Sequence, residues 1–157
     1  MGNAFTNSAT LNVLLIDGHE RDRSFYASRL KVCSRDYAIF EAANGRSGLR
    51  LYRSCHIDCV ILEIHLPDIS GFEVLSSLVP LPDTPEVPVI ILTNISHPGL
   101  LEAARENGAQ IALLKQSTTP DLLDQSILKV MSEGSPDRYP AVPAFLFESS
   151  WPLERSA

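Results

Sequence analysis

Three short, strongly apolar runs constrain the fold of this chain more than any other feature. They cover residues 11–16, 58–62 and 87–92, and only Asn12 interrupts the first run. Strands that are apolar along most of their length, rather than at alternate positions, have both faces covered and are typical of parallel sheets. A parallel sheet with helices on both faces is an α/β architecture, so these runs predict that fold class.

Helical patterns lie between the apolar runs, and two further runs complete a set of five strands. These further runs cover residues 37–41 and 110–114. The expected helices cover residues 20–32, 44–53, 70–78, 98–107 and 119–131. Short connections and this chain length predict a flavodoxin-like doubly wound five-stranded parallel sheet, with strand order 2-1-3-4-5 and helices on both faces.

Local signals support the helix boundaries. Asn44 can cap the second helix, Gly108 can end the fourth, and Thr119 followed by Pro120 can begin the fifth. In the first helix, the large side chains are expected to share one apolar stripe, and they are Phe25, Tyr26, Leu30 and Val32.

The chain divides into three segments by composition. Residues 1–10 are a flexible leader, residues 11–131 are the domain, and residues 132–157 are a tail that contains prolines and aromatic residues. The tail is either an unstructured linker or an apolar peptide that docks on this domain, its dimer mate or a partner. Several large apolar residues in a short stretch favour docking.

Charge and cysteine content exclude several classes of protein. The net charge of −6 argues against a protein that binds the phosphate backbone of nucleic acids. No apolar run is long enough to span a bilayer, and the first residues do not form a signal peptide. An odd number of cysteines without a secretion signal indicates reduced thiols and a cytoplasmic location. The segment Cys55–Cys59 is not expected to bind metal, because Cys59 opens a strand and cannot converge with Cys55.

Polar residues stand where four of the expected strands end. Asp17 follows the first strand, Glu63 the third, Thr93 the fourth and Lys115 the fifth. The carboxyl ends of parallel strands form the edge at which an open α/β sheet presents its chemistry. Two acids, a hydroxyl and an ammonium group are therefore expected to share one cleft.

These four residues and one local motif resemble the receiver domain of two-component response regulators over about residues 11–131. The motif is Leu66-Pro67-Asp68-Ile69-Ser70-Gly71-Phe72-Glu73-Val74-Leu75. The resemblance implies that an aspartate at the position of Glu63 accepts a phosphoryl group and that neighbouring acids bind Mg²⁺. It also implies that a lysine and a hydroxyl bond the phosphate oxygens, and that an aromatic side chain then turns inward.

The acidic positions of the family are only partly kept. Asp17 matches the first acid of the family's acidic pair, but Gly18 stands at the second. Glu20 could supply an oxygen to the acidic pocket instead. Glu63 places its carboxylate about 1.5 Å further out than an aspartate would, which is enough to spoil an in-line geometry. Asp17 and Glu63 remain as candidate metal ligands, and Mg²⁺ binding is expected to be weakened or absent.

The positions that carry the family's switch are also only partly kept. Thr93 matches the switch hydroxyl and Lys115 the phosphate-pairing lysine, whereas Gln116 replaces a proline and Ala112 replaces the aromatic residue. Glu63 can reach towards Lys115 and stand in for part of a phosphate's charge. These departures predict a pseudo-receiver that keeps the fold and loses the phosphotransfer chemistry.

Three hypotheses for the function remain. The leading one is a receiver-like signalling module of a two-component phosphorelay, not an enzyme, that binds a histidine kinase, another regulator or a second copy of itself. The second is a working single-domain regulator that accepts a phosphoryl group with Mg²⁺ at low efficiency. The third, a flavodoxin-like cofactor binder, is disfavoured because residues 17–22 contain three acids that repel phosphate. His19 and His65 are expected to be exposed, and Asp68 to shape its loop.

Overall fold

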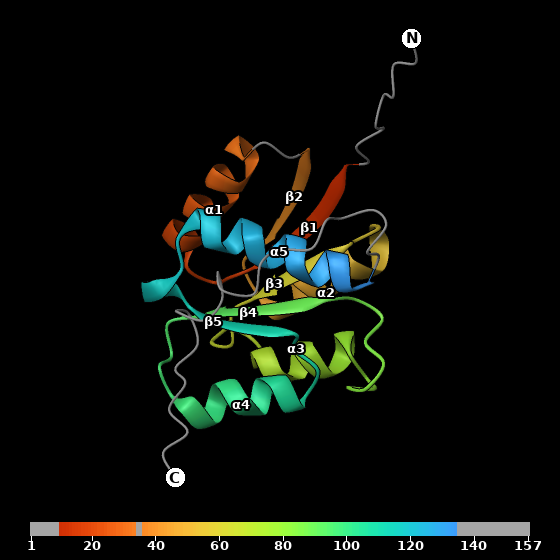
Figure 1. Ribbon diagram of the computed structural model, residues 1–157. Coiled ribbons are helices and arrows are strands. Elements are labelled where there is room, and N and C mark those ends of the chain that lie inside the picture. The colour runs from red at the N-terminus through yellow and green to blue at the C-terminus, as the bar shows by residue number, and fades with distance from the viewer. Residues whose placement is uncertain (1–9, 34–35, 135–157) are drawn as a thin grey trace.

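The computed structural model describes residues 10–33 and 36–134, which form alternating strands and helices around one sheet (Figure 1). The strands are β1 (Leu11–Ile16), β2 (Tyr37–Ala42), β3 (Cys59–Leu62), β4 (Val89–Thr93) and β5 (Ile111–Leu114). The helices are α1 (Glu20–Val32), α2 (Gly45–Ser54), α3 (Gly71–Leu78), α4 (Pro98–Glu106) and α5 (Pro120–Gly134), and a 3₁₀ turn, η1 (Lys115–Ser117), follows β5.

The five strands are all parallel, and their order in the sheet is β2-β1-β3-β4-β5. This confirms the predicted fold class and strand order. In the register, Ile16 lies beside Leu62, so the residues that follow β1 and β3 are neighbours at the same edge. Thr93 pairs with Leu114, which places Lys115 directly after the end of the adjacent strand β5.

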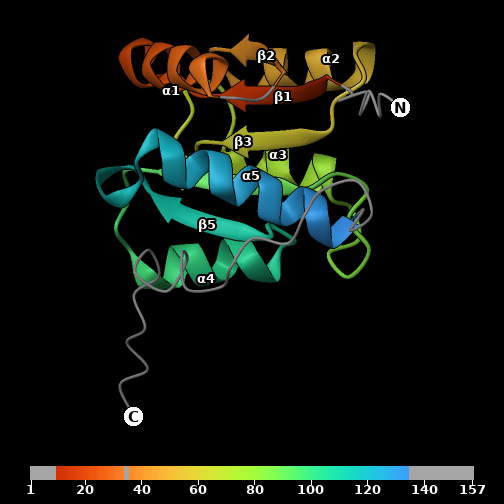
Figure 2. The same cartoon turned by 45° about the horizontal axis from the view of Figure 1, so that its top comes forward.

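Helices cover both faces of the sheet, as the continuous apolar strands predicted (Figure 2). Alternate residues of β1 enter different cores because successive side chains of a strand point to opposite faces. Leu14 and Ile16 belong to the core that α2, α3 and α4 cover. Val13 and Leu15 belong to the core beneath α1 and α5.

Strand β1 and helix α1 have the predicted bounds, and the bounds of the other elements differ from the predicted ones by at most three residues. The helix expected to end at residue 131 continues as α5 to Gly134. Strand β4 begins at Val89 rather than at residue 87, because Pro88 has no backbone N–H to donate to the ladder. Gly108 ends the segment after α4 with a φ of 102°, a conformation that favours glycine.

One expectation for α1 was wrong. Tyr26 and Leu30 are buried as predicted, but Phe25 is 45 % exposed and Val32 is 80 % exposed. Successive helical residues are separated by about 100°, so Phe25 cannot face the sheet together with Tyr26. The four large side chains therefore do not form the single stripe that was expected.

No helix among residues 10–33 and 36–134 is both long enough and apolar enough to cross a membrane. The leader (all but its last residue) and nearly all of the tail lie outside the described residues.

Candidate functional site

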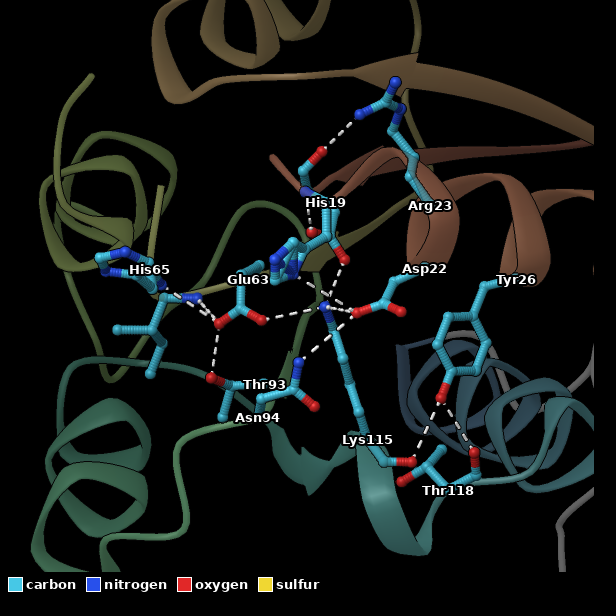
Figure 3. Close-up of polar contacts among 12 residues, drawn as sticks. His19, Asp22, Arg23, Tyr26, Glu63, His65, Thr93, Asn94, Lys115 and Thr118 are labelled. Atoms are coloured by element: carbon cyan, nitrogen blue, oxygen red, sulfur yellow. Dashed lines mark hydrogen bonds and ion pairs between the residues drawn. The ribbon is translucent and has the colours of Figure 1, made fainter. Parts of the chain in front are cut away.

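The polar residues predicted at the strand ends meet at one buried site (Figure 3). Asp17 follows β1, Glu63 follows β3, Thr93 ends β4 and Lys115 begins η1. Each of these side chains belongs to a residue that is at most 9 % exposed. Buried polar groups are costly unless they are paired, so the contacts among them decide what the site can do.

The ammonium group of Lys115 lies at the centre of the site and pairs with three carboxylates. Its Nζ lies 2.6 Å from Oδ2 of Asp17, 2.8 Å from Oδ2 of Asp22 and 3.1 Å from Oε2 of Glu63. An ammonium has three N–H donors, so all of them have partners here. Burial acts to lower the pKa of Lys115, but the hydrogen bonds with Asp17 and Asp22 outweigh it and raise the pKa well above its usual 10.5.

The second oxygen of the Glu63 carboxylate is also fully occupied. Its Oε1 accepts hydrogen bonds from the backbone N–H of Ile64 at 2.7 Å and of His65 at 3.1 Å. The hydroxyl of Thr93 donates to the same oxygen at 2.5 Å. Glu63 therefore bonds the switch hydroxyl, the lysine and the loop amides at once.

Asp22 is a site residue that the sequence interpretation missed. It lies on the first turns of α1, where its Oδ2 also accepts from Nδ2 of Asn94 at 3.5 Å. The hydrogen bond from Lys115 lowers the pKa of Asp22. No strand-end pattern marked Asp22 in the sequence. The structure places Tyr26, four residues further, on the same face of α1, and its hydroxyl donates to Lys115 O and Thr118 O beside the site.

Glu20, which was predicted to contribute to the acidic pocket, does not reach the site. It is exposed at the first position of α1, and its side chain makes no hydrogen bond or ion pair with any described residue. Residues two positions apart on a helix point in directions that differ by about 200°. Glu20 therefore faces away from the site when Asp22 faces Lys115. Asp22 thus takes the place that the sequence interpretation gave to Glu20.

The chain can now be compared with known proteins. The family described as response regulator receiver domain matches residues 13–127. The chain belongs to the response regulator receiver domain family. It is 24 % identical over 115 residues to the polar-differentiation response regulator DivK of Brucella ovis, covering 73 % of this chain and 92 % of that protein.

Two further relatives fit the same assignment. The chain is 29 % identical over 125 residues to a probable cyclic di-GMP phosphodiesterase of Vibrio cholerae, covering 80 % of this chain but only 28 % of that protein. The receiver domain of a LuxO repressor from Vibrio parahaemolyticus superimposes with a TM-score of 0.70 at 27 % identity, covering 79 % of this chain and 92 % of that one. This receiver domain therefore has the fold of two-component signalling proteins.

The side chains of this receiver domain do not fit the Mg²⁺ ion that its family implies. Mg²⁺ demands near-octahedral coordination by available oxygen atoms. Both oxygens of Asp17 already accept hydrogen bonds, from His19 N at 2.8 Å and from Lys115, and Gly18 offers no side chain. Among residues 10–33 and 36–134, no group of three His, Cys, Asp or Glu residues could hold a metal ion. The weakened binding of Mg²⁺ stays a prediction.

The space beside Gly18 bears on the same question. A Cβ added at Gly18 would lie 2.9 Å from Cδ of Pro67, so an acid at this position requires a small displacement of the proline ring. A pocket of about 280 Å³ opens over Glu63, and it is lined by Gly18, His19, Glu63, His65, Pro67, Asn94 and Ile95. The two histidines are exposed at its rim, as expected.

Asp68 has a structural role in the loop after β3. Its Oδ1 accepts from the backbone N–H of Gly45 at 2.8 Å, and its Oδ2 accepts from Arg46 at 2.9 Å. Desolvation opposes ionisation of Asp68, but these two N–H groups outweigh it and lower the pKa. Asp68 thus joins the loop beside Glu63 to the beginning of α2, where a carboxylate also complements the helix dipole.

Within the part of the chain that the structure describes, the segment Cys55–Cys59 belongs to no group of three His, Cys, Asp or Glu residues that could hold a metal ion. Cys59 is fully buried within β3, and desolvation raises the pKa of its thiol to about 12. Nε2 of His56 lies 2.9 Å from Oδ1 of Asp58, at the surface.

Replacing Asp22 by asparagine is expected to cost about 0.5–1 kcal/mol of unfolding free energy at pH 7, a modest value because the Asp22 side chain is 36 % exposed. The folded-state pKa of Asp22 is lower than 3.8, so its stabilisation is present above pH 3.8 and is lost as the pH falls through the folded pKa. Urea titrations of the natural protein and of Asp22→Asn at pH 7 and pH 3 measure this difference.

The matched control is Asp83→Asn, because Asp83 is exposed in the loop after α3. Its stability should equal that of the natural protein at both pH values. A deficit of Asp22→Asn that is as large at pH 3 as at pH 7 contradicts the assignment of the ion pair.

Proposed function

We propose that this receiver domain is a signalling module that acts by protein–protein contacts, without normal aspartyl phosphorylation. It is not an enzyme in this proposal. The observation that carries it is the Glu63 carboxylate, which bonds both Thr93 and Lys115. In the family, those two groups bond the oxygens of a phosphoryl group, and here a side chain of the protein occupies them.

The geometry of Glu63 also makes it a poor phosphoryl acceptor. A carboxylate oxygen must approach phosphorus in line, with a free lone pair. Three hydrogen bonds hold Oε1 of Glu63, and an ammonium group holds Oε2. Attack requires some of these bonds to break inside a buried site, where unpaired polar groups are expensive.

The ammonium group of Lys115 is also fully paired with carboxylates of the protein. Asp17 and Asp22 hold it at 2.6 Å and 2.8 Å, so its charge is already balanced by groups other than Glu63. An incoming phosphoryl group would meet three carboxylates around one ammonium, an arrangement that repels further negative charge. The absence of an acid at Gly18 removes one ligand for a cation that could offset the repulsion.

The partner in this proposal is a histidine kinase, another response regulator or a second copy of the chain. Ala112 supports a role without a phosphate-driven switch, because it is buried in the core and carries no ring that could move. Such a domain presents one arrangement of its helices to its partner. Pull-down from the native source with the natural protein and with Glu63→Lys identifies partners that depend on the intact site.

Incubation with acetyl phosphate and Mg²⁺, followed by intact mass spectrometry, tests the proposal. We expect no gain of mass for the natural protein. The double variant Glu63→Asp with Gly18→Asp shortens the acceptor by about 1.5 Å and supplies the missing acid, so it should gain one phosphoryl group.

The control is Glu63→Gln, which has the shape of the natural residue and no carboxylate to phosphorylate. A Mg²⁺-dependent gain of one phosphoryl group by the natural protein, absent from Glu63→Gln, contradicts the proposal. That result supports the second candidate, a regulator phosphorylated at low efficiency, which the pocket over Glu63 favours.

A further inference from the structure

A second hollow lies between α1 and the beginning of α5, outside the carboxylate site. Its volume is about 400 Å³, within the range of pockets that hold compact ligands. It is lined by Phe25, Arg29, Val32, Cys33, Pro120 and Asp121. These residues define the α1–α5 groove, and both views show the two helices side by side on one face of the sheet (Figures 1 and 2).

The α1–α5 groove carries exposed apolar side chains. Three large hydrophobic residues are exposed in the described part of the chain, and two of them, Phe25 and Val32, line this groove. Phe25, Arg29 and Val32 are separated by four and three positions, so they lie on one face of α1. Scattered apolar residues are normal, but a shared apolar hollow marks an interaction surface.

The tail supplies a segment of matching chemistry. Residues 145–153 contain five large apolar residues, which are Phe145, Leu146, Phe147, Trp151 and Leu153. Glu148 lies within this segment and Arg155 lies beside it, and the groove offers each of them one opposite charge, on Arg29 and on Asp121. We propose that residues 145–153 dock in the α1–α5 groove of their own chain.

The connection is long enough for this contact. Helix α5 begins at the groove with Pro120 and ends at Gly134, about 21 Å away at 1.5 Å per residue. The ten residues 135–144 can span about 33 Å when extended. The tail can therefore turn back at the end of α5 and reach the groove.

Attachment to the same chain favours the tail over any free partner. A short tether keeps the local concentration of a segment on the order of millimolar, so even a weak contact is populated.

The fluorescence of Trp151 tests the proposal directly, because it is the only tryptophan of the chain. In the natural protein we expect emission at shorter wavelength than in the groove variant Val32→Asp. We also expect a roughly threefold lower iodide quenching constant, since the tether keeps the groove largely occupied. Val32 is 80 % exposed, so its substitution leaves the core intact.

Alkylation of cysteines by iodoacetamide gives an independent measurement. Cys33 lines the groove, whereas Cys55 ends α2 on the opposite face and serves as the internal control. Cys33 should react several-fold faster in Trp151→Asp than in the natural protein, with Cys55 unchanged. Trp151→Asp alters the tail alone, so the folded domain remains as it is.

Two outcomes overturn the proposal. In the first, Val32→Asp leaves the quenching of Trp151 unchanged and Trp151→Asp leaves the rate at Cys33 unchanged. In the second, both effects appear only at high protein concentration, together with a dimer in light scattering, which shows that the tail docks on a second copy. Effects that are independent of concentration in a monomer support docking within the chain.

Discussion

Replacing Lys115 by methionine is expected to lower the free energy of unfolding by about 3–5 kcal/mol, the cost of leaving buried charges without a partner. Methionine keeps the length of the side chain but removes the charge that pairs with three carboxylates. Asp17 is 1 % exposed and Glu63 is 5 % exposed, so water cannot replace the lost partner. Urea unfolding at pH 7, followed by circular dichroism, measures the loss.

Two further variants test whether the loss of stability comes from the ion pairs of Lys115. Lys31→Met removes an exposed lysine from α1 and should change stability by no more than about 0.5 kcal/mol. Asp17→Asn in the Lys115→Met background removes one unpaired acid and should recover part of the loss. A deficit of Lys115→Met that is as small as that of Lys31→Met shows that Lys115 is not the centre of the site.

The pH dependence of Lys115 has a defined sign. Its folded-state pKa is raised above 10.5, so the stabilisation is complete below pH 10.5 and is lost as the pH rises through the folded pKa. Between pH 6 and pH 9 Lys115 stays protonated, so titration of this lysine should not change the loss of unfolding free energy caused by Lys115→Met.

The fold was predictable because its strongest determinants are local. Residues such as Val13 and Leu15 belong to one core and Leu14 and Ile16 to the other, so the apolar run itself indicates that both faces are covered. Asn44 does cap α2, accepting from Ser47 N at 2.8 Å. Once the strand order is known, the residues at the strand ends must be neighbours, which is why Asp17 and Glu63 could be placed together.

The positions of Asp22 and of the amide donors to Glu63 could not be predicted, because the pattern of apolar strands does not specify the rotation of a helix or the path of a loop. Glu20 was chosen because it follows Asp17 closely in the sequence, whereas Asp22 reaches Lys115 because of the rotation of α1 against the sheet. The two amides that donate to Glu63 come from the path of the loop after β3. Only the folded backbone fixes that path, so the sequence could not show that both oxygens of the Glu63 carboxylate have hydrogen-bonding partners.

The α1–α5 groove shows the same limit. A helical stripe predicts which residues are apolar, but not which neighbour covers them. Tyr26 and Leu30 are buried in the core beneath α1 and α5, while Phe25 and Val32 remain exposed beside the first residues of α5. The packing of α1 against the rest of the fold, a tertiary property, decides this difference.

Replacing Gly71 by alanine is expected to cost at least about 2–3 kcal/mol of unfolding free energy, because it overpacks a backbone contact. A Cβ at this position would lie 2.5 Å from Cα of Ile64 and 2.7 Å from the carbonyl oxygen of Glu63. Both atoms belong to the backbone and cannot rotate away. The N–H of Gly71 also donates to Ile64 O at 2.8 Å, so the beginning of α3 holds the loop that carries the amide donors to Glu63.

The substitution should therefore disturb the carboxylate site as well as stability. Chemical denaturation measures the stability, and amide chemical shifts of Ile64 and His65 report the hydrogen bonds to Glu63. Gly99→Ala is the control, because its Cβ would meet only the side chain of His97, at 3.1 Å, and should change stability by no more than about 0.5 kcal/mol. If Gly71→Ala is as stable as Gly99→Ala and leaves both amide shifts unchanged, α3 does not position the loop.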